Sequence, residues 1–429
     1  MGQPIRNTVK EAHPDITAES IYTLLVDGGS LLRQSFKDNR LNNNGIHYGG
    51  VFQFLLQLRI MMQKREWDYV YVFFDAHDSG ILRYQIYPGY KANRDKDYAE
   101  HVDGLSDYMK EYNAKLAQMQ NYVFNKKKKT STETKDERYY IDKFKKNQIT
   151  EEGIKTVLGK KEGTHVISLA KDEIVKENFE RERNLLCNYF NELFIRWMID
   201  EKTEGDDLIS YYVHHRLPNE KVVIMSADED LTQLIDDSVF VYNNIKKELY
   251  SKKIFKQVKG FPNENVVLKK VFCGDKSDNI GNIAGVSEGR LIELMPEILA
   301  RPVAINEVRE RAKEKVKERI SQKKKPLKWH ENIVNGVSNN VYPGDFYEIN
   351  EKIISLEHPL LTKEAEEELK EMMHNVQDPE GRSFENLYSY MLEDGIDELS
   401  DSDRFAFFFE PYKPLVDKEI KRYRKETSK

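Results

Sequence analysis

Three apolar segments of this sequence are each followed by an aspartate. Asp27 follows the run TLLV, Asp75 follows YVFF, and Asp228 follows VVIMSA. If these runs are strands of an open α/β sheet, their carboxyl ends border the crevice in which such sheets bind ligands. Three carboxylates at one rim repel one another unless cations neutralise them. A single aspartate after a strand is usually a turn residue or a helix cap, but three in succession favour a cation site.

Further acidic residues occur in three short clusters. The segment TEGDD begins a predicted helix, SADEDL places acids two residues apart, and GDKSDNI places acids three residues apart after a glycine. The additional candidate ligands are Glu204, Asp206, Asp207, Asp230, Asp275 and Asp278. Helix capping is the simpler explanation for TEGDD, because Thr203 can cap the helix and Asp206 has the capping-box spacing. Capping does not require three acids in four positions, however. Oxygen ligands without Cys or His suit Mg²⁺ or Mn²⁺ rather than zinc.

The composition narrows the class of protein. The chain of 429 residues has 67 Lys and Arg against 73 Asp and Glu, so its net charge of −6 excludes a histone-like polycation. Only two cysteines occur, Cys187 and Cys273, which excludes a disulfide scaffold and a Cys-rich zinc site. No run of about 18 apolar residues occurs, and the N-terminus lacks the apolar core of a signal peptide. We therefore expect a cytoplasmic protein that does not contact a membrane.

Four short segments rich in β-branched and aromatic residues predict buried strands. They are Ile21–Val26, Tyr69–Phe74, Val222–Met225 and Val239–Tyr242. Helical patterns lie between them, and one apolar stripe runs from Leu186 through Phe190 and Leu193 to Trp197. Strands that alternate with helices predict an α/β domain with a mainly parallel central sheet flanked by helices.

Charge is strongly segregated along the chain. Residues 251–330 have a net charge of +9, and residues 331–429 have a net charge of −11. A lysine run, Lys126, Lys127, Lys128 and Lys129, lies in a polar stretch with few apolar residues. A lysine run of this kind usually forms a solvated face. The separate excess of positive charge in residues 251–330 is suited to nucleic-acid phosphates.

Six motifs, taken in order, resemble the family of 5′-nucleases. This family includes flap endonucleases, the 5′→3′ exonuclease domain of bacterial DNA polymerase I and the bacteriophage 5′-exonuclease–ribonuclease H enzymes, and the last two groups fit best. The motifs are VDG at 26–28, FFDA at 73–76, YPGYKANR at 87–94, EGDD at 204–207, SADEDL at 226–231 and GDKSDNI at 274–280. The resemblance spans residues 21–300. It implies a PIN-like nuclease core with a helical arch insertion and a helix–three-turn–helix region that binds DNA.

The resemblance also implies a phosphodiester hydrolase with two Mg²⁺ or Mn²⁺ ions. The first ion would lie among Asp27, Asp75, Glu204 and Asp206, and the second among Asp228, Asp230 and Asp278, with Asp207 and Asp275 nearby. Lys91 and Arg94 match basic residues at the base of the arch and would neutralise charge on the scissile phosphate. Arg83 either faces the same phosphate or is a surface charge.

Contacts with DNA are expected in three places. Tyr84, Tyr87 and Tyr90 either stack on an unpaired base or form a buried stripe, and the lysine run 126–129 would attract the displaced strand. In residues 275–291, Gly285 and Val286 match the helix–three-turn–helix of the family. Where relatives have a Gly-Glu-Lys-Thr or similar turn, this chain has Ser287, Glu288, Gly289 and Arg290. The basic residue is thus shifted by one position, which bears on whether a potassium ion binds there. The stretch 309–328, which includes Lys323, Lys324 and Lys325, suits duplex phosphates.

These observations divide the chain into four parts. We expect an extension at 1–20, a nuclease core at 21–250 with the arch at about 95–180, a basic duplex-binding region at 251–330 and an acidic region of unknown role at 331–429. Phe407, Phe408 and Phe409 in the last region either anchor a partner such as a replication-fork protein or, more commonly, pack on the body of the protein.

The expected function is that of a monomeric, structure-specific 5′-nuclease acting on DNA with a 5′ flap, a nick or an RNA primer. It would act as a 5′→3′ exonuclease or flap endonuclease, with ribonuclease H activity as a further expectation. Two alternatives are a PIN-like endonuclease that cuts single-stranded RNA and a catalytically inactive DNA-binding scaffold. Nine clustered acids speak against the scaffold, because an inactive site has no use for their mutual repulsion.

Overall fold

The computed structural model describes residues 20–76, 79–92 and 135–428, with the side chains of 135 and 136 excluded. Within that part of the chain, six strands form one sheet in the order β3-β2-β1-β4-β5-β6. Their bounds are β1 Ile21–Asp27, β2 Tyr69–Asp75, β3 Arg196–Asp200, β4 Glu220–Met225, β5 Val239–Asn243 and β6 Glu248–Tyr250. All neighbours are parallel except β5 and β6. The predicted α/β class with a mainly parallel sheet is therefore confirmed.

The strand β3 was not expected. The predicted helical stripe from Leu186 to Trp197 is wrong at its end, because the helix α8 (Lys160–Glu192) stops and Trp197 lies in β3. The chain reverses at Phe194, whose φ of 55° lies in the left-handed region that bulky residues rarely adopt. Trp197 and Met198 keep the helical spacing of the preceding apolar residues, so periodicity alone cannot reveal this reversal.

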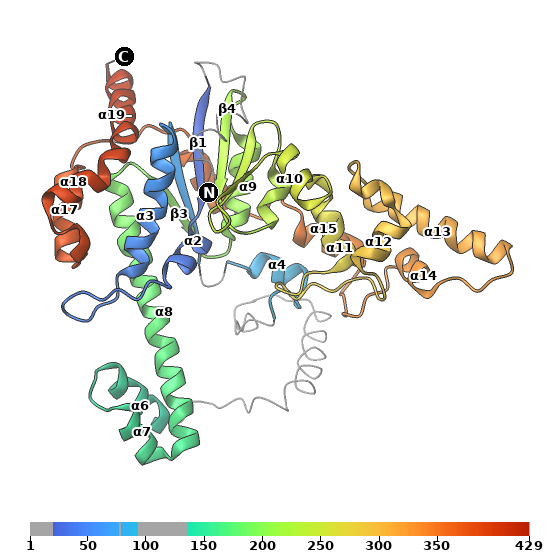
Figure 1. Ribbon diagram of the computed structural model, residues 1–429, viewed down its shortest axis with the longest axis horizontal. Coiled ribbons are helices and arrows are strands. Elements are labelled where there is room, and N and C mark those ends of the chain that lie inside the picture. The colour runs from blue at the N-terminus through green and yellow to red at the C-terminus, as the bar shows by residue number, and fades with distance from the viewer. Residues whose placement is uncertain (1–19, 77–78, 93–134, 429) are drawn as a thin grey trace, which may run out of the picture.

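Helices cover both faces of the sheet (Figure 1). One face packs against α2 (Gly28–Ser35), α3 (Gly49–Lys64), the second half of α8, α17 (Phe384–Glu393) and α18 (Ser402–Phe409). The other face packs against α9 (Gly205–His215), η2 (Asp230–Leu234), α10 (Lys252–Lys259) and α16 (Lys363–Met372). Along β1 the side chains alternate between these cores, with Leu24 and Val26 in the first and Leu25 in the second.

A third hydrophobic core lies beyond the carboxyl ends of the strands. It joins the turn after α4 (Ile81–Ile86) to a group of helices on the right in Figure 1. These are α11 (Val266–Cys273), α12 (Glu288–Leu294), α13 (Ile305–Ser321), α14 (Lys328–Asn335) and α15 (Phe346–Ile354). The arrangement holds the loop 274–287 against the rim where the strands end.

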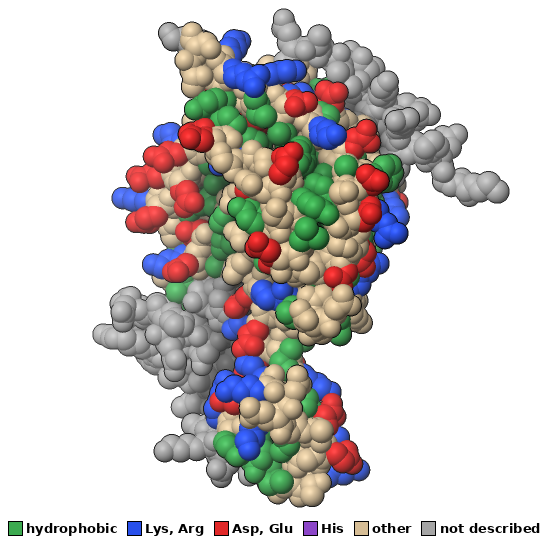
Figure 2. Space-filling model, turned by 90° about the vertical axis from the view of Figure 1, so that its left-hand side faces the viewer, with side chains coloured by type: hydrophobic (Ala, Val, Ile, Leu, Met, Phe, Trp, Pro, Cys, Tyr) green, Lys and Arg blue, Asp and Glu red, His purple; other side chains and the backbone are tan. Residues whose placement is uncertain are grey.

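The helices α6 (Lys135–Lys145) and α7 (Glu151–Leu158) pack on the first half of α8 and form a small unit that projects from the body (Figure 2). Its own core contains Ile141, Ile154, Val166, Ile167 and Ala170. These helices belong to the interval in which the arch was expected. Residues 93–134 of that interval, with Arg94 and Lys126 to Lys129, lie outside the described residues.

The acidic segment 331–429 is distributed over the molecule. Its helix α15 contributes to the third core, α16 covers one face of the sheet, and α17, α18 and α19 (Lys413–Thr427) lie at the other face. Phe408 and Phe409 are buried, which confirms packing on the body, whereas Phe407 is 68% exposed and lies beneath the guanidinium of Arg59. In the described part of the chain, no helix has the length and apolar character needed to cross a membrane.

Candidate active site

The first two acids of the site end neighbouring strands. Asp27 is the last residue of β1 and caps α2, because its Oδ1 accepts the Ser30 N–H at 2.9 Å and its Oδ2 accepts the Ser226 hydroxyl at 2.6 Å. Asp75 is the last residue of β2 and accepts the Gly205 N–H at 2.8 Å. Since β1 and β2 are parallel neighbours, their terminal carboxylates meet at one edge of the sheet.

Glu204 stands at the N-terminus of α9 and is held by three donors. It accepts bonds from Arg83 Nη1 at 2.5 Å, from the Tyr90 hydroxyl at 3.0 Å and from Lys91 Nζ. The expected capping role of Thr203 is wrong. Glu204 occupies the N-cap position, and the Thr203 hydroxyl accepts the Thr362 N–H instead.

Asp207 does not reach the rim, so its prediction as a metal residue is wrong. It is 1% exposed, its two oxygens accept bonds from both terminal nitrogens of Arg83, and it also accepts the Leu360 N–H at 2.9 Å. Arg83 is not a surface charge, because this side chain is buried and also donates to the Ile353 carbonyl at 2.9 Å. It supports the acids from behind, and its contact with a phosphate stays a prediction.

The second group of acids lies between η2 and the loop after α11. Carboxylate oxygens of Asp230, Asp275 and Asp278 all lie within 4.8 Å of one another. Lys270 Nζ, which sequence reasoning missed, bonds to Asp230 and lies 2.5 Å from Asp275 Oδ2. The only sequence signal for it is its position five residues before Asp275.

One hollow with a volume of about 600 Å³ brings the acids together. Seven of the nine predicted acids line it, namely Asp27, Asp75, Glu204, Asp206, Asp228, Asp230 and Asp278. Lys91, Lys270 and Arg83 also line it, as do Arg33 and Ser30, which were not predicted. Asp275 borders the group through Lys270, so Asp207 is the predicted acid that faces away.

The electrostatics of this hollow are unfavourable without a bound cation. Burial, reinforced by the charge of Asp75, raises the pKa of Asp27 to about 6. Burial and the charges of Asp228 and Asp27 raise the pKa of Asp206 well above its ordinary value. Burial likewise raises the pKa of Asp230 to about 6. Uncompensated carboxylate oxygens without Cys or His fit hard divalent cations such as Mg²⁺ or Mn²⁺.

The pKa of Glu204 is lowered, whereas the pKa values of these aspartates are raised. Burial opposes its ionisation, but the charges of Lys91 and Arg83 outweigh burial and lower the pKa of Glu204 to about 2. Lys91 itself has a φ of 51°, and its backbone N–H donates to the Asp278 carbonyl at 2.9 Å. This bond fixes the base of the segment 87–92 against the loop that carries Asp278.

The three tyrosines pack inside the protein, so the expectation that they stack on bases is wrong for this structure. Tyr84, Tyr87 and Tyr90 are 8%, 2% and 3% exposed. The ring of Tyr87 stacks on that of Tyr342, with centroids 4.6 Å apart. Apolar packing and the bond from Tyr90 to Glu204 account for their spacing.

The residues predicted for duplex binding lie in the loop between α11 and α12, at the start of α12 and after the end of α13. Gly285 has a φ of 80°, and Val286 is buried in the third core. Arg290 donates to the Gly285 carbonyl, and an added side chain at Gly289 would meet open space. Lys323, Lys324 and Lys325 are exposed after the end of α13. Their contact with DNA and the binding of potassium stay predictions.

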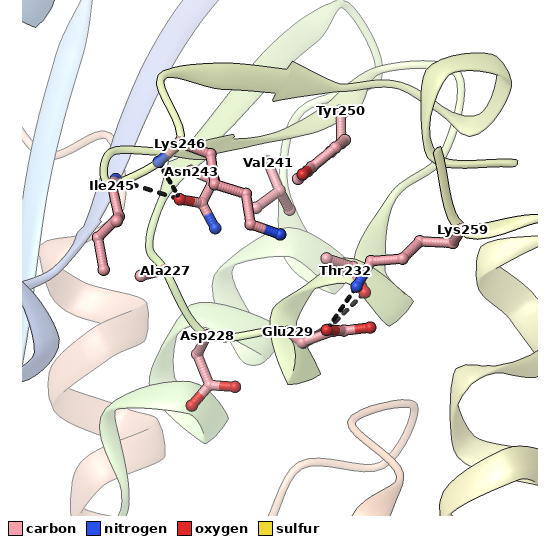
Figure 3. A pocket seen from close by; sticks show the side chains of 10 residues that line it. All are labelled: Ala227, Asp228, Glu229, Thr232, Val241, Asn243, Ile245, Lys246, Tyr250 and Lys259. Atoms are coloured by element: carbon pink, nitrogen blue, oxygen red, sulfur yellow. Dashed lines mark hydrogen bonds and ion pairs between the residues drawn. The ribbon is translucent and has the colours of Figure 1, made fainter. Parts of the chain in front are cut away.

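A smaller hollow, with a volume of about 150 Å³, adjoins the acidic one at Asp228 (Figure 3). Lys246 points into it from the turn between β5 and β6, and Lys259 forms an ion pair with Glu229 at 2.6 Å. The Asn243 side chain fixes this turn by accepting the backbone N–H groups of Ile245 and Lys246. A lysine therefore lies next to the acidic hollow on the side of β5.

Residues 22–125 and 169–260 match the family model described as the 5′-3′ exonuclease, N-terminal resolvase-like domain. These segments of the chain are similar to that family. Its members are nucleases that hydrolyse phosphodiester bonds. Apart from Ile21, the matched segments contain all six strands β1 to β6 and the acids from Asp27 to Asp230, whereas Asp275 and Asp278 lie beyond the match.

Two curated proteins are similar to part of this chain. A 5′-3′ exonuclease of Mycoplasmopsis pulmonis is 36% identical over 86 residues, which are 20% of this chain and 29% of that protein. DNA polymerase I of Bacillus subtilis is 29% identical over 143 residues, which are 30% of this chain and 16% of that protein. The chain thus spans less than a third of the length of either relative.

Solved structures were also compared. The T5 D15 protein co-crystallised with metal ions has a TM-score of 0.48 and 13% identity, covering 93% of this chain and 99% of that one. Human GEN1 in complex with Holliday junction DNA has a TM-score of 0.46 and 11% identity, covering 97% of this chain and 74% of that one.

Proposed function

We propose that this chain is a divalent-metal-dependent 5′-nuclease that hydrolyses phosphodiester bonds near the 5′ end of branched or nicked DNA. The observation that carries the proposal is the hollow at the carboxyl edge of the sheet, lined by seven carboxylates. The match of residues 22–125 and 169–260 to the 5′-3′ exonuclease family supports the reaction class.

The residues fit two divalent cations. Asp27, Asp75 and Asp206 offer oxygens on one side of the hollow, and Asp230 and Asp278 offer oxygens on the other. Bound Mg²⁺ or Mn²⁺ would supply an activated water and would stabilise charge on the phosphate and the leaving oxygen. Burial and the mutual repulsion of the carboxylates, which together raise the pKa of Asp206, make cation binding favourable here.

The other side chains of the hollow orient the carboxylate of Glu204 and would neutralise charge on the phosphate. Arg83 and Tyr90 hold Glu204 from behind, so its carboxylate has a fixed direction. Lys91 lies at the open side of Glu204 and could transfer its bond to a phosphate oxygen, which would place a positive charge on the scissile group. The phosphate would then replace a carboxylate as the partner of the ammonium.

Duplex binding is proposed for the loop 274–287 and the helix α13. The loop carries Asp275 and Asp278 and is continuous with α12, so a duplex held there would lie next to the acidic hollow. The helix α13, the following turn and the first residue of α14 carry 10 basic residues between 309 and 328. Such a row suits the phosphates of a duplex better than unstructured RNA.

The test is a product-length comparison on 5′-labelled substrates in Mg²⁺. We expect cleavage near the 5′ end of a flap or nicked duplex, with no cleavage in EDTA. Preferential cutting of unstructured RNA would instead favour the single-strand endoribonuclease. Binding of flap DNA without cleavage in either metal would favour the inactive scaffold. Including an RNA–DNA hybrid tests the ribonuclease H expectation in the same assay.

A further inference from the structure

The Lys270 ammonium lies among the acids expected to hold the second cation. Its Nζ bonds to Asp230 and to Asp275, with the second contact at 2.5 Å. These two acids and Asp278 are the three whose oxygens lie within 4.8 Å of one another. An ammonium in contact with two members of such a group takes up lone pairs that a divalent cation would need.

The other side of the hollow has no such cation on two of its acids. Among the described residues, no lysine or arginine forms an ion pair with Asp27 or Asp206, and Asp75 pairs with the exposed Arg33 at 3.5 Å. Lys91 and Arg83 pair with Glu204 on this side. The two halves therefore differ, because Lys270 bonds to two acids of the second group, whereas the carboxylates of Asp27 and Asp206 in the first group have no cation of the chain in place of an ion.

We propose that Lys270 is a resident counter-cation that a divalent ion must displace from Asp230 and Asp275, so that the two ions of the site load in order. The inference rests on the proposed metal-dependent function and deepens it. The first ion enters among Asp27, Asp75 and Asp206 without displacing a lysine. The second enters only when Lys270 leaves, and its affinity is lower for that reason.

Two physical effects act in the same direction. Before the ion binds, Lys270 offsets the repulsion between Asp230 and Asp275. Binding of a divalent ion therefore relieves less repulsion and has a less favourable free energy. After the ion binds, the nearby ammonium and the divalent ion repel each other. The lysine stem is long and flexible, and its side chain is 21% exposed, so it can turn towards solvent when displaced.

The adjacent Lys269 provides a matched control. It lies on the same helix, but its Nζ pairs with Glu288 at 2.6 Å and lies over the ring of Phe261. Lys269→Met removes one positive charge from α11 without changing the partners of Asp230 or Asp275. Lys270→Arg keeps the charge at the position of interest.

The experiment is calorimetric titration of the full chain with Mn²⁺, without nucleic acid, for wild type, Lys270→Met, Lys270→Arg and Lys269→Met. We expect the wild type to bind one ion more tightly than another. Lys270→Met should tighten the weaker ion by about tenfold, the effect of removing roughly one unit charge near the surface. The stronger ion should change much less, and Lys269→Met should titrate like the wild type.

Unchanged or weakened binding of the second ion by Lys270→Met would overturn the inference while leaving the proposed function in place. Failure of the wild type to bind any divalent ion would overturn both. If Lys270→Met does not fold, Lys270→Gln and the rise in melting temperature with Mn²⁺ take its place. The rise should then be larger for the neutral variant than for Lys270→Arg, and an equal rise would contradict the inference.

Discussion

Arg83 and Asp207 form a buried, two-point ion pair behind the acidic hollow. Both terminal nitrogens of Arg83 meet the two oxygens of Asp207, with the Nη2–Oδ1 distance at 3.0 Å. The same Nη1 also donates to Glu204 at 2.5 Å. The pair thus connects a carboxylate that faces the hollow to one that faces the interior, and it fixes the start of α9.

Replacing Arg83 by methionine should destabilise the protein strongly. The change leaves Asp207 and part of Glu204 buried without their cation, and breaking one partner of a buried pair typically costs about 3–5 kcal/mol. Urea unfolding in EDTA measures the effect. Arg33→Met is the control, since that side chain is 59% exposed and its contact with Asp75 is long. Similar losses for both variants would contradict a structural role for Arg83.

Tyr90→Phe should lower the cleavage rate and leave the affinity for DNA nearly unchanged. The Tyr90 hydroxyl donates to Glu204, and the ring is buried, so removing the hydroxyl loosens a carboxylate of the hollow without altering the surface. We expect a rate decrease of about tenfold, the effect of roughly 1.4 kcal/mol in the transition state. Single-turnover cleavage and equilibrium binding separate the two effects. Lost affinity with an unchanged rate would revive the stacking interpretation.

Asp206→Asn should stabilise the metal-free protein while weakening metal binding. Burial and the charges of Asp228 and Asp27 raise the pKa of Asp206, which shows that its ionised form is disfavoured there. Removal of this charge should raise the free energy of unfolding in EDTA by about 1 kcal/mol, in the range of substitutions that relieve strained functional sites. Addition of Mn²⁺ should then raise the melting temperature less than in the wild type. A destabilised metal-free variant would contradict this account.

The pair of His47 and Glu182 should make stability depend on pH above 6.5. The hydrogen bond that the protonated His47 ring donates to buried Glu182 raises the pKa of His47 above its ordinary value of 6.5. Since the folded state binds the proton more tightly, the stabilisation is full below the pKa of the unfolded state and is lost as pH rises through the higher folded value. His47→Gln should remove this pH-dependent part of the free energy of unfolding. Unfolding in urea at about pH 6 and about pH 8.5 checks it, and a difference between wild type and variant that is equal at both values would contradict it.

The sequence predicts the sheet and the rim of acids because both follow from short local patterns. Apolar runs such as TLLV and YVFF form β1 and β2, and parallel strands bring Asp27 and Asp75 to the same edge. The 5′-nuclease resemblance then points to Glu204 and Asp206, which line the same hollow.

The features that sequence reasoning missed depend on contacts between distant segments. Asp207 follows Asp206 directly, but one residue of the helix α9 turns its side chain by about 100° towards Arg83. The sequence alone therefore does not show that Asp206 faces the hollow and Asp207 the interior. Lys270 becomes part of the hollow only because α11 packs beside η2. The tyrosines near Lys91 have the spacing of either a stacking surface or a core, and burial decides for the core.

We propose that the carboxylates of this hollow perform metal-dependent phosphodiester hydrolysis. Asp75→Ala tests it most directly, because Asp75 lies at the end of β2 and lines the hollow. Single-turnover cleavage of a 5′-flap duplex in Mg²⁺ should fall by at least about 10³-fold, the equivalent of roughly 4 kcal/mol, while affinity for the same duplex in Ca²⁺ stays within about threefold of wild type. Undiminished cleavage by Asp75→Ala would contradict the account.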